Sequence, residues 1–332
     1  MIKEGSQKPL LAVENLRARL STHRGYVRAV DGVSFILEQG KSLGLVGESG
    51  CGKSMLARAL MGLLPQGSVV SQDSKIAFQG LNLLGLPANQ LRRIIGKEMT
   101  MIFQDPMTAL NPVIKVGQQI AEVLIHHLKV DKQTARNRAL ELLEQVDVPL
   151  PERRLDQYPH QLSGGLRQRV AIAISLACEP QLLIADEPTT ALDVTVQAGI
   201  LDLLARLAKE KEMAIILITH DLGVVAGRTD ETAVMYAGKI VEKAPTHDLF
   251  KHMAMPYTQA LMDAIPRLSN PTHTRLQAIG GQPPDLVDLP TGCRFSPRCL
   301  RVEPRCQSKE PILRNINGKN HWFACWYPLK TS

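Results

Sequence analysis

The stretch Gly47-Glu48-Ser49-Gly50-Cys51-Gly52-Lys53-Ser54 decides the fold of this 332-residue chain. It fits the pattern G-x-x-x-x-G-K-[ST], and it stands between a predicted strand over 42–46 and a predicted helix over 53–64, as that pattern requires. In such a loop the glycines let backbone amides turn toward phosphate oxygens, and the start of the helix adds positive potential. The sequence therefore predicts a phosphate-binding loop (P-loop) rather than an ordinary glycine turn.

The side chains of the P-loop have separate chemical roles. Lys53 can reach the β- and γ-phosphates of a nucleotide, and the Ser54 hydroxyl can ligate Mg²⁺. Cys51 has two interpretations: a thiol whose pKa is lowered by nearby amides and a lysine, or a small side chain that the loop tolerates. The predicted nucleotide contacts in the loop are Gly47, Ser49, Gly50, Cys51, Gly52, Lys53 and Ser54.

The composition is that of a globular protein with a sizeable core. Hydrophobic residues make up 44% and charged residues 21% of the chain, which excludes a mostly disordered or collagen-like protein. No uncharged stretch approaches the roughly 18 to 20 apolar residues of a membrane helix. Residues 1–16 have neither the apolar core of a signal peptide nor the pattern of a transit peptide, so we expect a cytoplasmic protein.

The charge balance leaves two interpretations open. Lys and Arg outnumber Asp and Glu by 39 to 32, which gives a formal charge of +7. Basic chains can bind anionic surfaces or nucleic acid. Because no dense basic run is present, scattered and solvated lysines and arginines are the preferred interpretation.

From about residue 10 to residue 250 the chain alternates short β-branched or leucine-rich runs with longer segments of helical period. This alternation predicts an α/β fold with a parallel sheet flanked by helices. The expected strands are 42–46, 99–103, 182–185 and 214–219, and the expected helices are 53–64, 134–146, 166–177 and 197–209. The segment 105–161 is predicted to be a mainly helical insertion. After residue 250, recurrent prolines predict a small, loop-rich appendage.

Two acids follow the apolar run 182–185. Asp186 is expected beside the Mg²⁺ at the carboxyl edge of the sheet, and Glu187 can orient or deprotonate the water that attacks the γ-phosphoryl group. The alternative for a lone Asp-Glu pair is a solvated loop, and the upstream P-loop weakens it.

Further motifs in order along the chain resemble the nucleotide-binding subunit of an ABC transporter. Gln104 resembles the Q-loop glutamine of that family, Leu162-Ser163-Gly164-Gly165-Leu166 resembles the signature motif LSGGQ with its last residue changed, and Ala191-Leu192-Asp193 resembles the D-loop. His220 resembles the switch histidine, and Tyr26 stands where the family stacks an aromatic ring on adenine.

The resemblance implies roles for these residues. Glu187, His220 and Gln104 would be catalytic, and Mg²⁺ would be held by Ser54, Gln104 and Asp186. The remaining ATP contacts implied are Tyr26, Ser163, Gly164, Gly165 and Asp193. In the family the signature helix binds the ATP held by a partner cassette, so two ATP molecules are sandwiched head to tail.

The fold implied is α/β: a RecA-like P-loop NTPase of the ABC cassette type. It has an antiparallel β N-terminal part, an inserted helical subdomain and a small C-terminal appendage with cysteines. The predicted boundaries are 1–250 for the nucleotide-binding domain, with the helical insertion at about 105–161, and 251–332 for the appendage.

The stretches 103–112, 183–195 and 256–261 are similar to the ATPase subunits of oligopeptide/dipeptide-type importers. The resemblance implies an ATPase at the cytoplasmic face of the cell membrane, paired with a second homologous ATPase or with a copy of itself. Its further partners would be two membrane permeases, docked at the helical insertion beside Gln104, and an external substrate-binding protein. Peptide is the leading substrate class, with nickel or another small solute as the alternative.

Four of the six cysteines, Cys293, Cys299, Cys306 and Cys325, crowd the end of the chain, with five, six and eighteen residues between successive members. Four thiolates can ligate an iron-sulfur cluster or a tetrahedral zinc ion, and this spacing does not choose between them. The resemblance implies a 4Fe-4S cluster; zinc or unligated thiols follow, and disulfides come last in a reducing compartment.

Two other classes remain as rivals. A soluble ABC ATPase that acts on DNA or ribosomes would fit the positive charge, but such proteins typically carry a long coiled coil or two tandem cassettes, which this chain lacks. An exporter ATPase is disfavoured because exporters often fuse the cassette to membrane helices and lack this tail. We therefore expect no nucleic-acid partner.

Overall fold

The computed structural model describes residues 9–105, 109–190, 192–265, 279–315, 318 and 320–329. Parts of three sequence predictions lie outside these ranges: Pro106, Met107 and Thr108 of the subfamily stretch, Ala191 of the D-loop, and Pro266 and Pro271 of the appendage. The chain divides into two compact units. Unit 1 comprises Met1–Glu38, Ser42–Leu84 and Leu217–Ser332, and unit 2 comprises Gln39–Lys41 and Gly85–Ile216.

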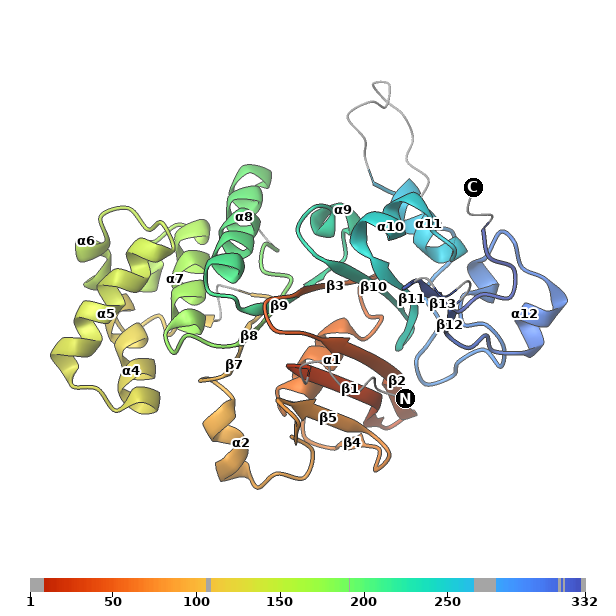
Figure 1. Cartoon of the computed structure of the whole chain (residues 1–332), viewed down its shortest axis with the longest axis horizontal. Helices are drawn as coiled ribbons and strands as arrows, with labels where there is room; N and C mark the ends of the chain where they lie inside the picture. The colour runs from red at the N-terminus through yellow and green to blue at the C-terminus, as the bar shows by residue number, and fades with distance from the viewer. Residues whose placement is uncertain are drawn as a thin grey trace. The chain divides into compact units, whose positions relative to one another are not determined.

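Unit 1 contains an antiparallel sheet built from the N-terminal part of the chain (Figure 1). Strand β1 (Leu11–Thr22) pairs with β2 (Gly25–Leu37) through a tight turn in which Gly25 has a φ of 120°, a conformation that favours glycine. Along its other edge, β1 pairs with two short strands, β4 (Ser68–Val70) and β5 (Lys75–Phe78). The last strand of the sheet, β6 (Leu81–Asn82), pairs with β5.

A second set of strands in unit 1 has the order β12-β13-β11-β10-β3. Strand β3 (Ser42–Val46) lies parallel to β10 (Glu231–Tyr236), and both are almost completely buried, as expected of apolar strands covered on both faces. The remaining strands pair antiparallel: β11 (Lys239–Pro245), β13 (Trp322–Phe323) and β12 (Arg314–Asn315). The helices of unit 1 are α1 (Lys53–Leu60), α9 (Leu222–Val225), α10 (Thr246–Lys251), α11 (Pro256–Asp263), η2 (Ser296–Arg298) and α12 (Pro304–Ser308).

Unit 2 combines parallel strands with a helical group. Strands β7 (Met99–Ile102) and β8 (Leu182–Asp186) pair in parallel, and β9 (Ala214–Thr219) begins beside β8 and ends in unit 1. The helices are α2 (Ala88–Ile94), α4 (Val116–Leu128), α5 (Lys132–Gln145), α6 (Pro151–Leu155), η1 (Pro159–Gln161), α7 (Gly164–Leu176) and α8 (Val194–Glu210). Figure 1 shows α4 to α7 packed together, so the segment 105–161 is largely helical.

The predicted α/β cassette with an antiparallel N-terminal part is confirmed. All four expected strands are present within one residue of their predicted ends. The expected helix over 53–64 was too long: α1 ends at Leu60, because Gly62 has a positive φ of 64° soon afterwards. The segments before and after the predicted boundary at residue 250 both belong to unit 1. Strand β13, after the boundary, pairs with β11, which lies before it.

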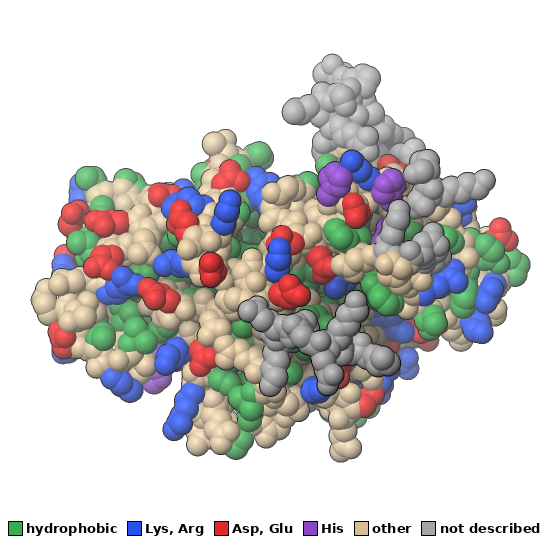
Figure 2. Space-filling model, in the orientation of Figure 1, with side chains coloured by type: hydrophobic (Ala, Val, Ile, Leu, Met, Phe, Trp, Pro, Cys, Tyr) green, Lys and Arg blue, Asp and Glu red, His purple; other side chains and the backbone are tan. Residues whose placement is uncertain are grey.

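Charged side chains are mixed over the surface that Figure 2 displays. Lysines and arginines are interspersed with aspartates and glutamates there, without one continuous basic field.

A buried carboxylate ties the C-terminal region to β11. Glu242 is 0% exposed; its oxygens accept hydrogen bonds from the backbone amides of Ala254 at 2.6 Å and Met255 at 3.2 Å. The Nε2 atom of His321 lies 2.8 Å from the same carboxylate. Because a buried carboxylate is tolerated only when it is hydrogen-bonded, these three contacts make Glu242 a structural anchor.

Glu242→Ala is expected to lower the free energy of unfolding by about 3 kcal/mol, because two backbone amides and His321 lose their partner at once. Urea denaturation followed by circular dichroism would measure this loss. Glu303→Ala, at an exposed position in the same region, serves as the control and should change stability by about 0.5 kcal/mol or less. Equal effects of the two substitutions would contradict the anchoring role.

Candidate functional site

The P-loop backbone lies too close to neighbouring strands to carry side chains at two positions. A Cβ atom added to Gly47 would lie 2.2 Å from the carbonyl oxygen of Met235, and one added to Gly52 would lie 2.0 Å from that of Ala29. Gly52 also has a φ of 109° and directly precedes α1. These glycines are therefore required by close backbone approach, as the sequence pattern indicated.

Lys53 turns back onto the loop. Its Nζ atom donates to the carbonyl oxygens of Gly47 at 2.6 Å and Glu48 at 3.0 Å, and the side chain is buried. Ser49 and Gly50 at the tip of the loop are exposed, whereas the base of the loop is buried. The arrangement keeps the ammonium against the loop with an open tip beside it, as a phosphate-binding loop requires.

Cys51 is a packing residue. The side chain is buried, and burial raises the pKa of its thiol, with the nearby Lys53 only partly opposing the shift. A lowered pKa, the reactive interpretation of this residue, is therefore wrong, because loss of hydration outweighs the lysine's charge. The backbone of Cys51 contributes a further anchor: its carbonyl oxygen accepts a hydrogen bond from the amide of Gly238 at 2.8 Å.

Tyr26 and His220, two further residues of unit 1 predicted for the ATP site, are both exposed. Tyr26 lies at the start of β2 and is 53% exposed, so its ring is open to solvent. His220 directly follows β9. Their roles toward a nucleotide stay predictions.

In unit 2, the carboxyl ends of β7 and β8 bring Gln104 and Glu187 together. The Nε2 atom of Gln104 donates to Glu187 Oε2 at 3.1 Å, and the Thr190 hydroxyl donates to the same oxygen at 3.0 Å. Glu187 has a φ of 45°, an uncommon value for this residue type. Such strain is a feature of functional sites, where surrounding contacts over-determine the backbone. Asp186, the last residue of β8, is buried beside it.

The signature motif and the described part of the D-loop also meet within unit 2. The side chain of Ser163 caps α7 by accepting from the amide of Leu166 at 3.4 Å, and Asp193 caps α8 by accepting from the amide of Val196 at 2.9 Å. A Cβ atom on Gly165 would lie 2.7 Å from Val196 Cγ1. Gly165 therefore lets the start of α7 approach the start of α8, with Ser163 and Asp193 exposed at the two caps.

The predicted residues thus form two groups, each described within its own unit. The P-loop, Tyr26 and His220 belong to unit 1, and Gln104, Asp186, Glu187, Ser163, Gly164, Gly165 and Asp193 belong to unit 2.

The four clustered cysteines line one cavity of about 20 Å³ in unit 1. Burial raises the pKa of Cys293 and Cys299, and burial together with the neighbouring thiols raises the pKa of Cys325 to about 11. All four are free thiols. The donor set fits a metal or cluster in kind, but among the described residues no group of three or more His, Cys, Asp or Glu is placed to hold a metal ion. The predicted iron-sulfur site is therefore not confirmed.

Sequence reasoning missed the contacts that the C-terminal region makes with the P-loop. Arg298 forms an ion pair with Glu48, and the Tyr257 hydroxyl accepts a hydrogen bond from the Glu48 amide at 2.9 Å. Burial raises the pKa of the Tyr257 hydroxyl. No local pattern signals these pairs, because Glu48 and Arg298 are 250 positions apart.

None of the helices in the described ranges is long and apolar enough to cross a bilayer.

Comparison with known proteins places the chain in a family. Residues 30–190 match the ABC transporter family, and residues 241–306 match the oligopeptide/dipeptide transporter C-terminal region. The oligopeptide transport ATP-binding protein OppD of Haemophilus influenzae is 52% identical over 95% of this chain and 98% of its own length. The dipeptide transport ATP-binding protein DppD of Bacillus subtilis is 47% identical over 96% of this chain and 94% of its own length.

A solved structure shares the fold. The dimeric ATP-binding cassette MJ0796, in a post-hydrolysis state bound to ADP and phosphate, superposes with a TM-score of 0.63 at 26% identity. The match covers 71% of this chain and 98% of that one.

These similarities and the P-loop geometry define the chain as an ABC ATPase cassette. Within that class, it belongs to the family of oligopeptide and dipeptide transport ATP-binding proteins.

Gly52→Ala is expected to destabilise the protein by about 3 kcal/mol, because the new methyl group meets the Ala29 carbonyl and the backbone is left-handed. Gly67→Ala is the matched control: Gly67 has a φ of 83°, but nothing lies within 4 Å of an added Cβ. This control should lose only about 1 kcal/mol from backbone strain. Thermal or urea unfolding compares the two, and a Gly52→Ala protein as stable as the control would rule out the close approach.

Proposed function

We propose that this chain hydrolyses ATP to drive the uptake of di- and oligopeptides through two membrane permease subunits. The observation that carries the proposal is similarity to peptide transport ATP-binding proteins over nearly the whole chain, including the C-terminal region. The close packing of the P-loop and the position of Lys53 support nucleotide binding at this loop. On this proposal the protein works at the cytoplasmic face of the cell membrane, with an external binding protein delivering the substrate.

The proposed chemistry uses the residues that the sequence motifs assign to the nucleotide. Lys53 and the P-loop amides bind the triphosphate, and Glu187 accepts a proton from the attacking water or orients it. The hydrogen bonds from Gln104 and Thr190 hold the Glu187 carboxylate in one orientation, which suits a base that must face a single water molecule. His220 would contact the γ-phosphate. Mg²⁺, held by Ser54, Asp186 and Gln104, would neutralise charge on the phosphates.

The proposal includes a second cassette. Ser163, Gly164 and Gly165 stand at the start of α7, with Ser163 exposed and the two glycines half-buried, where backbone amides and the helix dipole favour an anion. Asp193 lies at the adjacent cap of α8. We assign these residues to the ATP of a partner cassette, which is consistent with the related cassette solved as a dimer. The partner would be a homologous ATPase or a copy of this chain.

Glu187→Gln is expected to lower ATP turnover by about 100- to 10,000-fold while nucleotide binding is retained, because the amide cannot accept the proton of the attacking water. Turnover and uptake of a labelled dipeptide would be measured together in the transporter reconstituted with its permeases. Glu152→Gln, at an exposed position of α6 in the same unit, should leave both unchanged. Full turnover in Glu187→Gln would exclude the proposed base. Normal uptake of nickel but not of peptide would exclude the substrate class.

We further assign a 4Fe-4S cluster to Cys293, Cys299, Cys306 and Cys325. The support is that the four thiols line one cavity. Such a cluster takes four thiolate ligands.

Anaerobically purified protein is expected to contain about four iron atoms per chain and to absorb broadly in the visible range. Cys306→Ser should lose both signals, because it removes one ligand. Cys178→Ser is the control, since this cysteine lies outside the cavity. Wild-type protein that contains zinc, or no metal, would contradict the assignment.

A further inference from the structure

A buried arginine from the cysteine-containing tail contacts the P-loop directly. Arg298 belongs to η2, within residues 293–299 (here the cysteine segment), and its side chain is only 3% exposed. Its Nη1 and Nη2 atoms lie 2.6 Å and 2.8 Å from the two carboxylate oxygens of Glu48. This is a bidentate pair, the geometry in which an arginine fixes a carboxylate most strongly.

The remaining contacts of Arg298 hold the guanidinium in one orientation. Its Nε atom donates to the carbonyl oxygen of Gly280 at 2.8 Å, and its Cζ atom lies 5.9 Å from the centre of the Tyr236 ring. The Tyr236 ring belongs to an aromatic cluster in which Tyr236, Tyr257 and Phe295 contact one another with ring centroids 4.5 to 5.3 Å apart. The arginine therefore presents a rigid fork to Glu48.

Glu48 also contacts Lys53, the lysine that we propose binds phosphate. The carbonyl oxygen of Glu48 accepts from Lys53 Nζ, and its amide donates to the Tyr257 hydroxyl. The side chain and both backbone groups of one residue are thus engaged, by Arg298, Lys53 and Tyr257. A shift of the Glu48 side chain would displace a carbonyl oxygen that receives the Lys53 ammonium.

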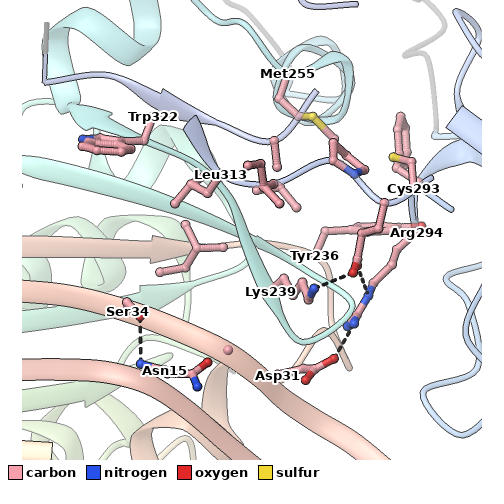
Figure 3. A pocket seen from close by; sticks show the side chains of 18 of the residues that line it. Asn15, Asp31, Ser34, Tyr236, Lys239, Met255, Cys293, Arg294, Leu313 and Trp322 are labelled. Carbon is pink, nitrogen blue, oxygen red and sulfur yellow. Dashed lines mark hydrogen bonds and ion pairs between the residues drawn. The ribbon is translucent and has the colours of Figure 1, made fainter. Parts of the chain in front are cut away.

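A second arginine of the cysteine segment supports the loop from another direction. Arg294 is 8% exposed in its side chain, donates to the Ala237 carbonyl oxygen at 2.5 Å, and pairs with Asp31 and Glu310. Figure 3 shows Arg294 pointing toward Asp31 at one side of a 390 Å³ cavity. The residue after Ala237, Gly238, donates to the Cys51 carbonyl oxygen. The cysteine segment therefore contacts the P-loop directly through Arg298 and indirectly through Arg294.

From these contacts we infer that Arg298 is a positioning residue of the nucleotide site: through Glu48 it holds the P-loop in the conformation that receives the triphosphate. The inference rests on the proposed nucleotide binding by the P-loop. It makes the cysteine segment a part of the nucleotide site. A purely structural tether between the tail and the cassette would affect stability alone.

The test is nucleotide affinity in the full-length chain, measured by titration with fluorescently labelled ATP and Mg²⁺. Arg298→Gln should raise the Kd about tenfold or more, because Glu48 loses its bidentate partner and the loop loses its fixed geometry. Arg298→Lys keeps the charge but not the fork, so it should give a smaller increase. In steady-state turnover, KM should rise while kcat changes by about threefold or less, because the residues that act on the attacking water are unaltered.

The matched control is Arg314→Gln. Arg314 lies in the same C-terminal region, donates to the Cys325 carbonyl oxygen at 2.9 Å and has its Cζ atom 6.0 Å from the centre of the Phe323 ring, so both of these partners belong to the C-terminal region itself. This variant should lower the unfolding temperature without raising the Kd. Glu48→Gln combined with Arg298→Gln should raise the Kd less than the product of the single effects, since the two residues act as one pair.

Distinct outcomes separate the inference from the function on which it rests. If Lys53→Ala bound ATP as well as the wild type, the proposed nucleotide site itself would be wrong. If Lys53→Ala lost binding but both Arg298 variants kept the wild-type Kd, the nucleotide site would stand and the positioning role would be overturned. Should Arg298→Gln fail to fold, Arg298→Lys and Glu48→Gln decide the question: raised Kd values support the role, and unchanged values reject it.

Discussion

The close packing of the P-loop backbone against two neighbouring strands is the constraint on which the nucleotide site depends. The carbonyl oxygens of Met235 and Ala29 occupy the space that side chains at Gly47 and Gly52 would need. Because the backbone is confined there, α1 begins at a fixed point and Lys53 folds back onto the loop. The positive end of the helix and the lysine are consequently delivered to one place, which is what binding of a triphosphate requires.

In unit 2 a glycine likewise permits a close approach, here between two helices. A glycine at position 165 permits two helix starts to approach, and side-chain caps at Ser163 and Asp193 satisfy amides that each helix leaves unpaired. At the ends of the two parallel strands, Gln104 restrains the carboxylate of Glu187. The residues that we assign to hydrolysis and to the partner's ATP therefore sit on well-defined helix and strand ends.

The C-terminal region is part of the architecture of unit 1. Its strand β13 extends the sheet at β11, Glu242 accepts hydrogen bonds from two backbone amides, and Arg298 pairs with the P-loop. Buried charges of this kind are stable only when every partner is in place. Arg298, the residue before Cys299, therefore joins the tail to the P-loop residue Glu48 through a direct ion pair.

The sequence by itself determined the α/β class, the P-loop, the strand that ends beside Asp186 and Glu187, and the helix start at the signature motif. These features follow from hydrophobic periodicity, glycine conformation and capping, which act over a few neighbouring residues. Tertiary structure alone decided that Cys51 is buried with a raised pKa, that four thiols share one cavity, and that Arg298 pairs with Glu48. Burial and ion pairing join residues far apart in the chain, so they depend on how the finished elements pack, and no local pattern encodes them.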